Sequence, residues 1–150
     1  MDDPLIRAIF LAQLASTWFM TGLIWFVQVV HYPLLAHAGP ERYVDYQRRH
    51  MSLTSWVVGP PMLVEALTAL LMFRYRPTSA TTLELSIGFA LVAVIWLSTL
   101  LFQVRCHRIL CAGFETTCHR RLVATNWIRT AAWSLRSALT LWMVWVALSA

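Results

Sequence analysis

The stretch that decides the fold is residues 85–104, LSIGFALVAVIWLSTLLFQV, which contains no charged residue. A helix needs about 20 predominantly apolar residues to cross the hydrocarbon core of a bilayer, so this stretch predicts a transmembrane helix. Three further apolar runs share this character, and the four predicted spans lie near residues 8–31, 53–73, 84–110 and 118–148. The expected fold is therefore all-α, an integral membrane, antiparallel four-helix bundle.

The composition supports a single membrane domain. The 150 residues are 59% hydrophobic and only 13% charged, whereas about a quarter of the residues in a soluble domain carry charge. Four spans leave no room for an extramembrane domain, so residues 1–150 are predicted to form one four-span domain. The twelve basic residues are all arginine and are dispersed along the chain, which excludes the basic face that nucleic-acid binding requires. The expected partners are membrane lipid, a lipophilic small molecule, and partner membrane subunits or a second copy.

The connection between the first two spans predicts a short additional segment. Pro33 should end the first helix, and Gly39-Pro40-Glu41 provides a turn that opens the polar residues 42–51. We expect this amphipathic segment to lie on the membrane surface. Gly59-Pro60-Pro61 should kink the second span or leave its first turn irregular.

Arginine counts predict the orientation in the plasma or inner membrane. One side of the membrane receives seven connecting arginines, namely Arg42, Arg48, Arg49, Arg105, Arg108, Arg120 and Arg121. The other side receives three, namely Arg7, Arg74 and Arg76. Since cytoplasmic connections carry the excess of basic residues, the side with seven is predicted to be cytoplasmic, and both termini to be non-cytoplasmic.

This topology places all five histidines and all three cysteines on the cytoplasmic side. Histidine and thiolate are common ligands of zinc, copper and iron, so the metal-ligand candidates are His31, His50, His107 and His119. No pair shows a dedicated ligand spacing, however, and polar residues gather at membrane interfaces in any case, so no metal is assigned. The sequence does not decide whether the cofactor is haem, a quinone or none.

Charged residues within spans are costly and are usually paired or functional. With the hydrocarbon core taken to begin near Trp56 on the second span and near Ile128 on the fourth, Glu65 lies nine residues deep and Arg136 eight. At 1.5 Å per residue the depths are ~13 and ~12 Å, which predicts an ion pair. Such a pair either locks the helix register or serves a function.

The ends of the spans suggest a candidate site. His31 and His107 end the first and third spans, while Asn126 and Arg129 open the polar face of the fourth, so these four candidate catalytic residues should converge at the cytoplasmic mouth of one cavity. Gln28 precedes His31 by three residues and Gln103 precedes His107 by four, and both amides could orient the imidazoles. The remaining ligand-binding candidates are the deep aromatic residues Trp96 and Trp133.

Two stretches carry a resemblance to a known family. Phe102-Gln103-Val104-Arg105-Cys106-His107-Arg108-Ile109-Leu110 and Asn126-Trp127-Ile128-Arg129-Thr130 resemble the C-terminal half of the anthrone-oxygenase-like family of small four-helix membrane proteins, over about the last 50 residues. That family often has Pro-x-Asn where this chain has Arg105-Cys106-His107. The resemblance implies oxidation or oxygenation of a hydrophobic aromatic in a bundle cavity, with polar roles for His107, Asn126 and Arg129.

The function most consistent with these patterns is that of a membrane oxidoreductase or oxygenase-like protein that holds a lipophilic aromatic or a quinone. In it, His31 or His107 would accept a proton, Arg129 would stabilise a developing phenolate or enolate, and Asn126 would orient the ligand. Two alternatives remain. One is an accessory or assembly subunit of a larger membrane complex, and the other is a haem-binding electron carrier that uses His31 and His107.

Overall fold

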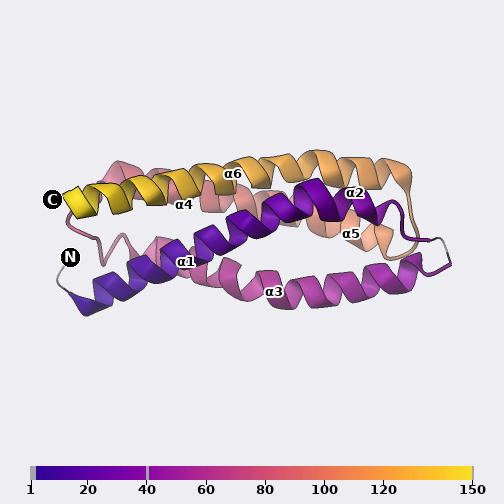
Figure 1. Ribbon diagram of the computed structural model, residues 1–150, viewed down its shortest axis with the longest axis horizontal. Coiled ribbons are helices and arrows are strands. Elements are labelled where there is room, and N and C mark those ends of the chain that lie inside the picture. Colours follow the sequence, from indigo (N-terminus) through magenta and orange to yellow (C-terminus); the bar gives the residue numbers. More distant parts are fainter. Residues whose placement is uncertain (1–2, 40, 150) are drawn as a thin grey trace.

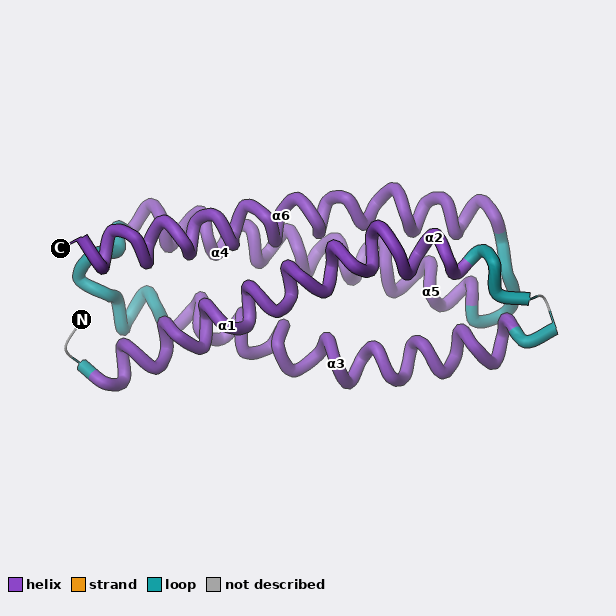
Figure 2. Tube along the Cα trace, viewed as in Figure 1, coloured by secondary structure: helices purple, strands orange, loops and turns teal. Residues whose placement is uncertain are grey.

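A computed structural model describes residues 3–39 and 41–149 as a bundle of long helices (Figure 1). Its elements are α1 (Pro4–Phe26), η1 (Val27–His31), α2 (Tyr32–Leu35), α3 (Tyr43–Leu71), α4 (Thr82–Ser98), η2 (Thr99–Gln103), α5 (Val104–Leu110) and α6 (Thr116–Ser149). Here η denotes a π-helical turn. Because η1 and η2 continue their neighbouring helices, the chain forms four antiparallel rods, and the described residues contain no strand (Figure 2).

Each rod is long and apolar enough to cross a bilayer. The four candidate spans are Pro4–Leu35, Tyr43–Leu71, Thr82–Leu110 and Thr116–Ser149. Large apolar side chains point away from the bundle, among them Leu67, Leu97 and Leu135, each more than half exposed. An apolar outer surface of this kind is suited to contact with lipid. The predicted fold class, a four-helix bundle of a multi-pass membrane protein, is confirmed.

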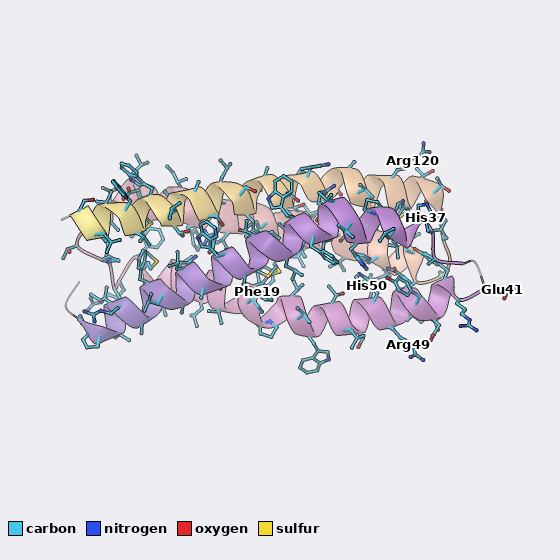
Figure 3. All side chains as sticks on the ribbon, in the orientation of Figure 1. Phe19, His37, Glu41, Arg49, His50 and Arg120 are labelled. Carbon is cyan, nitrogen blue, oxygen red and sulfur yellow. The ribbon has the colours of Figure 1, made fainter. Side chains whose placement is uncertain are left out.

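Both termini lie at one end of the bundle, and the connections α2–α3 and α5–α6 lie at the other (Figure 1). The histidines belong to the end that carries these two connections, where Figure 3 labels His37, Glu41 and Arg120, with His50 further along α3. The shared end agrees with the predicted grouping of the histidines. Which end faces the cytoplasm stays a prediction.

The structure corrects two expectations about the connections. Residues 43–51 are not a separate surface segment but the first turns of α3, which continues without a break through Gly59-Pro60-Pro61. Pro33 does not end the first helix, which continues to Leu35. A proline in an α-helix clashes with the carbonyl four residues earlier. The π-helical turn directly before Tyr32 widens the backbone there and accommodates the ring.

The two π-helical turns lie at matching places in the first and third rods. In each, a backbone N–H reaches the carbonyl five residues earlier, from Tyr32 to Val27 in η1 and from Val104 to Thr99 in η2. The extra residue rotates the rest of each helix relative to a regular α-helix. Such turns are frequent at functional sites, and both lie beside the hydrogen-bonded side chains of Tyr32, Gln103 and His107.

Candidate functional site

A cavity of about 290 Å³ opens between the four rods near the histidine-rich end. Its wall is mainly apolar and includes Met20, Ile24, Val58, Met62 and Trp96. The polar lining is concentrated in a few groups, which are Tyr32, His50, Gln103, His107 and Arg129, together with the hydroxyls of Thr54, Ser55 and Thr99. An apolar chamber with a few convergent polar groups is typical of a small-molecule site.

The centre of the polar lining is a hydrogen-bonded pair formed by Tyr32 and His107. The Tyr32 hydroxyl lies 3.0 Å from Nε2 of His107, and both side chains are buried. On the other side of the ring, Nε2 of Gln47 donates to Nδ1 of His107 at 2.8 Å. With Nδ1 as acceptor, the imidazole is neutral and its proton lies on Nε2, directed at Tyr32.

Three further hydrogen bonds hold this pair in place. The Tyr32 hydroxyl is 3.5 Å from Oε1 of Gln103, and Nε2 of Gln103 donates to Oγ1 of Thr125 at 3.0 Å. Nε2 of His119 donates to the backbone carbonyl of Tyr32 at 2.8 Å and so ties α6 to α2. Residues from the four helices α2, α3, α5 and α6 therefore hold the phenol of Tyr32 and the imidazole of His107 in position.

Three imidazoles form a row that begins at His107. The ring of His50 lies 5.4 Å from that of His107, centroid to centroid, and the ring of His31 stacks on His50 at 4.4 Å. His31 faces a neighbouring groove of about 210 Å³ between α1 and α3, which shares Val27, His50 and Thr54 with the cavity. Nε2 of His31 is buried and has no hydrogen-bond partner.

This row does not form a metal centre. Over residues 3–39 and 41–149, no three histidine, cysteine, aspartate or glutamate side chains are placed to hold an ion. Both ring nitrogens of His107 are already hydrogen bonded. His119 uses Nε2 as a donor to a backbone carbonyl. An iron ligand would need a free nitrogen lone pair, so haem ligation by His107 requires either the Tyr32 contact or the Gln47 contact to break.

Arg129 is the charged group of the cavity. Its side chain is 6% exposed, and its Cζ atom lies 5.2 Å from the ring centroid of Trp133. The Nε atom of Arg129 has no hydrogen-bond partner. The chain forms ion pairs between Arg49 and Asp45 and between Arg136 and Glu65. The cavity arginine thus takes part in neither.

A second polar cluster lies deeper in the bundle, on the side of the termini. Oε1 of Glu65 accepts from Nε of Arg136 at 2.9 Å and from Oγ1 of Thr17 at 2.8 Å. Oε2 of Glu65 accepts from Nε1 of Trp133 at 3.0 Å. Arg136 also donates to the carbonyl of Gly88. The contact between Glu65 and Arg136 suggested by their matched depth is therefore present, and it fixes α3 against α6.

The structure brings together some of the candidates and separates others. His107, Arg129, Gln103 and Trp96 line the cavity, whereas His31 lies in the neighbouring groove and Trp133 is buried behind Arg129. Asn126 and Gln28 are not among the residues that line the cavity. They bind each other instead, because Nδ2 of Asn126 donates to Oε1 of Gln28 at 2.8 Å. Gln28 also donates to the Val123 carbonyl and does not orient His31. Gln103 likewise meets Tyr32 and not His107.

Three residues of the site have roles that were not predicted from the sequence. Tyr32 and Gln47 were not among the predicted site residues, and His50 was predicted only as a candidate metal ligand. A signal for Tyr32 exists: it follows Gln28 by four residues, as His107 follows Gln103 by four, and the two pairs are 75 residues apart (Gln28 to Gln103, Tyr32 to His107). Tyr32, and not His31, is thus the counterpart of His107.

Comparison with protein-family models, curated proteins and solved structures gives no match.

Proposed function

We propose that this protein is a membrane oxidoreductase of the oxygenase-like type that binds a lipophilic aromatic or a quinone in the cavity. The observation that supports this proposal most directly is the combination of an apolar chamber with one polar wall, made by Tyr32, His107 and Arg129. The resemblance of residues 102–110 and 126–130 to the anthrone-oxygenase-like family points to the same substrate class. A planar aromatic would lie against Trp96, with its oxygen directed at the polar wall.

In the proposed reaction, the Tyr32–His107 pair removes a proton from the substrate. Nε2 of His107 can accept a proton when Nδ1 carries the ring hydrogen, and this needs an acceptor at Gln47. Turning the amide of Gln47 provides one, because its Oε1 has no partner in the present orientation. His107 then takes the hydroxyl proton of Tyr32, and Tyr32 takes the proton of the substrate.

The electron pair left by that proton moves onto the substrate oxygen, and Arg129 stabilises the resulting phenolate or enolate. Molecular oxygen is the oxidant in this proposal. For a substrate with a CH₂ group between two aromatic rings, one oxygen atom becomes the new carbonyl and the other leaves as water. The mainly apolar lining of the chamber would strengthen the attraction between the guanidinium and the oxyanion.

Oxygen uptake tests this proposal. Purified protein in lipid nanodiscs is mixed with anthrone, and oxygen consumption and the quinone product are followed against empty nanodiscs. The variants Tyr32→Phe and His107→Ala are expected to lower kcat by about 10²-fold or more, as for loss of a general base. His37→Ala is the matched control, because His37 lies at the same end of the bundle and is exposed. Turnover no faster than in empty nanodiscs, with no aromatic or quinone in an organic extract of the protein, would contradict the proposal.

The same preparation distinguishes the two alternative functions. A Soret absorption band would support the haem-binding electron carrier. A membrane protein that co-purifies in fixed ratio, without any bound lipophilic molecule, would support the accessory subunit.

A further inference from the structure

The charges inside the bundle do not balance. Two arginines are buried, Arg129 and Arg136, but Glu65 is the only buried carboxylate among the described residues. That carboxylate is bound by Arg136 at 2.9 Å. Arg129 therefore leaves one positive charge in the membrane interior without an anion from the described chain. An unpaired charge at such a place is expensive, and proteins that retain one use it.

Arg129 keeps hydrogen-bonding capacity for an additional partner. Its Nε is buried without an acceptor, and the ring of Trp133 contacts one face of the guanidinium. The planar donor set of a guanidinium matches an oxyanion better than any neutral group. The Tyr32 hydroxyl, which donates to Oε1 of Gln103 at 3.5 Å, lines the same wall of the cavity. The polar wall is thus suited to a negatively charged oxygen.

The remainder of the cavity is suited to an apolar body. Met20, Ile24 and Met62 line its interior, and the neighbouring groove continues from it past Val27 and Val58 toward the outer surface. There Leu53 and Val57 are 67% and 49% exposed and would face lipid. A molecule dissolved in the bilayer could place its tail in the groove and its head group in the cavity.

We infer that the cavity binds an amphiphile whose head group is an oxyanion, a phenolate, enolate or carboxylate, with Arg129 as its counter-ion. The inference rests on the proposed occupation of this cavity by a lipophilic molecule and adds the charge of that molecule. The bound ligand restores neutrality to the bundle interior, because its one negative charge offsets the positive charge of Arg129.

Two fluorescent probes of nearly equal shape test the charge requirement. The probes are 9-anthracenecarboxylate, which is ionised at pH 7, and the neutral 9-anthracenemethanol, each titrated into protein in neutral-lipid nanodiscs with empty nanodiscs subtracted. The carboxylate is expected to bind at least tenfold more tightly than the alcohol. Equal or tighter binding of the alcohol would overturn the inference but leave the proposed function in place. Binding of neither probe would contradict both.

Substitutions then assign the effect to Arg129. Arg129→Gln is expected to weaken binding of the carboxylate at least tenfold and to leave that of the alcohol within twofold, while Arg129→Lys retains an intermediate affinity. Arg121→Gln is the matched control, since it removes the same charge from an exposed position on α6. An unchanged ratio of the two affinities in Arg129→Gln would overturn the inference.

Two more measurements complete the test. Thermal denaturation without ligand should show Arg129→Gln at least as stable as the parent, because an unpaired buried charge has been removed; a clearly lower Tm would assign Arg129 a structural role and overturn the inference. Dodecanoate and dodecanol distinguish the source of the oxyanion. Displacement of the aromatic carboxylate by dodecanoate and not by dodecanol supports a lipid carboxylate, and displacement by neither supports an aromatic oxyanion.

Discussion

The Nε atom of Arg136 lies 2.9 Å from Oε1 of Glu65 in the interior of the bundle, with the two side chains 2% and 1% exposed. Removing one partner of such a pair leaves an uncompensated buried charge. Glu65→Leu is therefore expected to lower the free energy of unfolding by about 3–5 kcal/mol, and the double variant Glu65→Leu/Arg136→Met to recover much of that loss. Reversible denaturation in mixed detergent micelles measures both.

The lipid-facing substitution Leu67→Ala on the same helix is the control, since Leu67 is 58% exposed. A double variant that is less stable than Glu65→Leu would show that the two residues do not stabilise the bundle as a pair.

Gly59 offers a direct way to fill the cavity. It lies in the cavity wall, and an added Cβ would meet no atom within 4 Å. Gly59→Leu should therefore fold normally and reduce binding of an anthracene probe at least tenfold. Gly22→Leu is the control, because Gly22 also has no atom within 4 Å of an added Cβ and is exposed on α1. Equal binding by the two variants would place the probe outside this cavity.

His119 is expected to stabilise the fold and not to react. Its Nε2 donates to the Tyr32 carbonyl at 2.8 Å, so His119→Ala leaves a buried acceptor unsatisfied and should lower the free energy of unfolding by about 1–3 kcal/mol. His37→Ala, in the exposed connection after α2, should change it little. Equilibrium denaturation of the two variants measures this difference. Equal free energies of unfolding would show that His119 does not stabilise the fold.

The orientation in the membrane can be tested with reporter fusions. The arginine count of seven against three predicts that the C-terminus and the 76–82 connection are both external, and the structure places the C-terminus and the start of α4 at the same end of the bundle (Figure 1). Reporters that are active only outside the cytoplasm should be active at both positions. A cytoplasmic result at either one would reverse the assignment.

The carboxylate of Glu115, directly before α6, is expected to make the thermal stability of the protein depend on pH. Backbone N–H groups of Thr117 and Cys118 donate to its carboxylate and lower its pKa below the ordinary 4.5. A lowered pKa in the folded state adds stability that is present above pH 4.5 and is lost as the pH falls through the folded pKa. The Tm advantage of the parent over Glu115→Gln should therefore shrink below about pH 4.5. Glu41→Gln controls for the loss of one exposed negative charge.

Sequence alone determined the class and the architecture of this protein. Long runs without charge, such as residues 85–104, leave a helix across the bilayer as the stable conformation, because a backbone in lipid must satisfy its own hydrogen bonds. Because a helix rises about 1.5 Å per residue, the depths of Glu65 and Arg136 in the membrane could be calculated from the sequence, and their contact could be predicted. The grouping of the histidines at one end followed from the alternation of the spans.

Only the tertiary structure decided which polar side chains meet. The π-helical turns η1 and η2 rotate the helix ends, so Tyr32 and not His31 faces His107, and periodicity at 3.6 residues per turn could not reveal that shift. Gln47 reaches His107 from α3, across a contact between residues 60 positions apart in the chain. The burial of Arg129 in the cavity wall and the unpartnered state of its Nε likewise depend on the packing of the four rods, which local spacing does not encode.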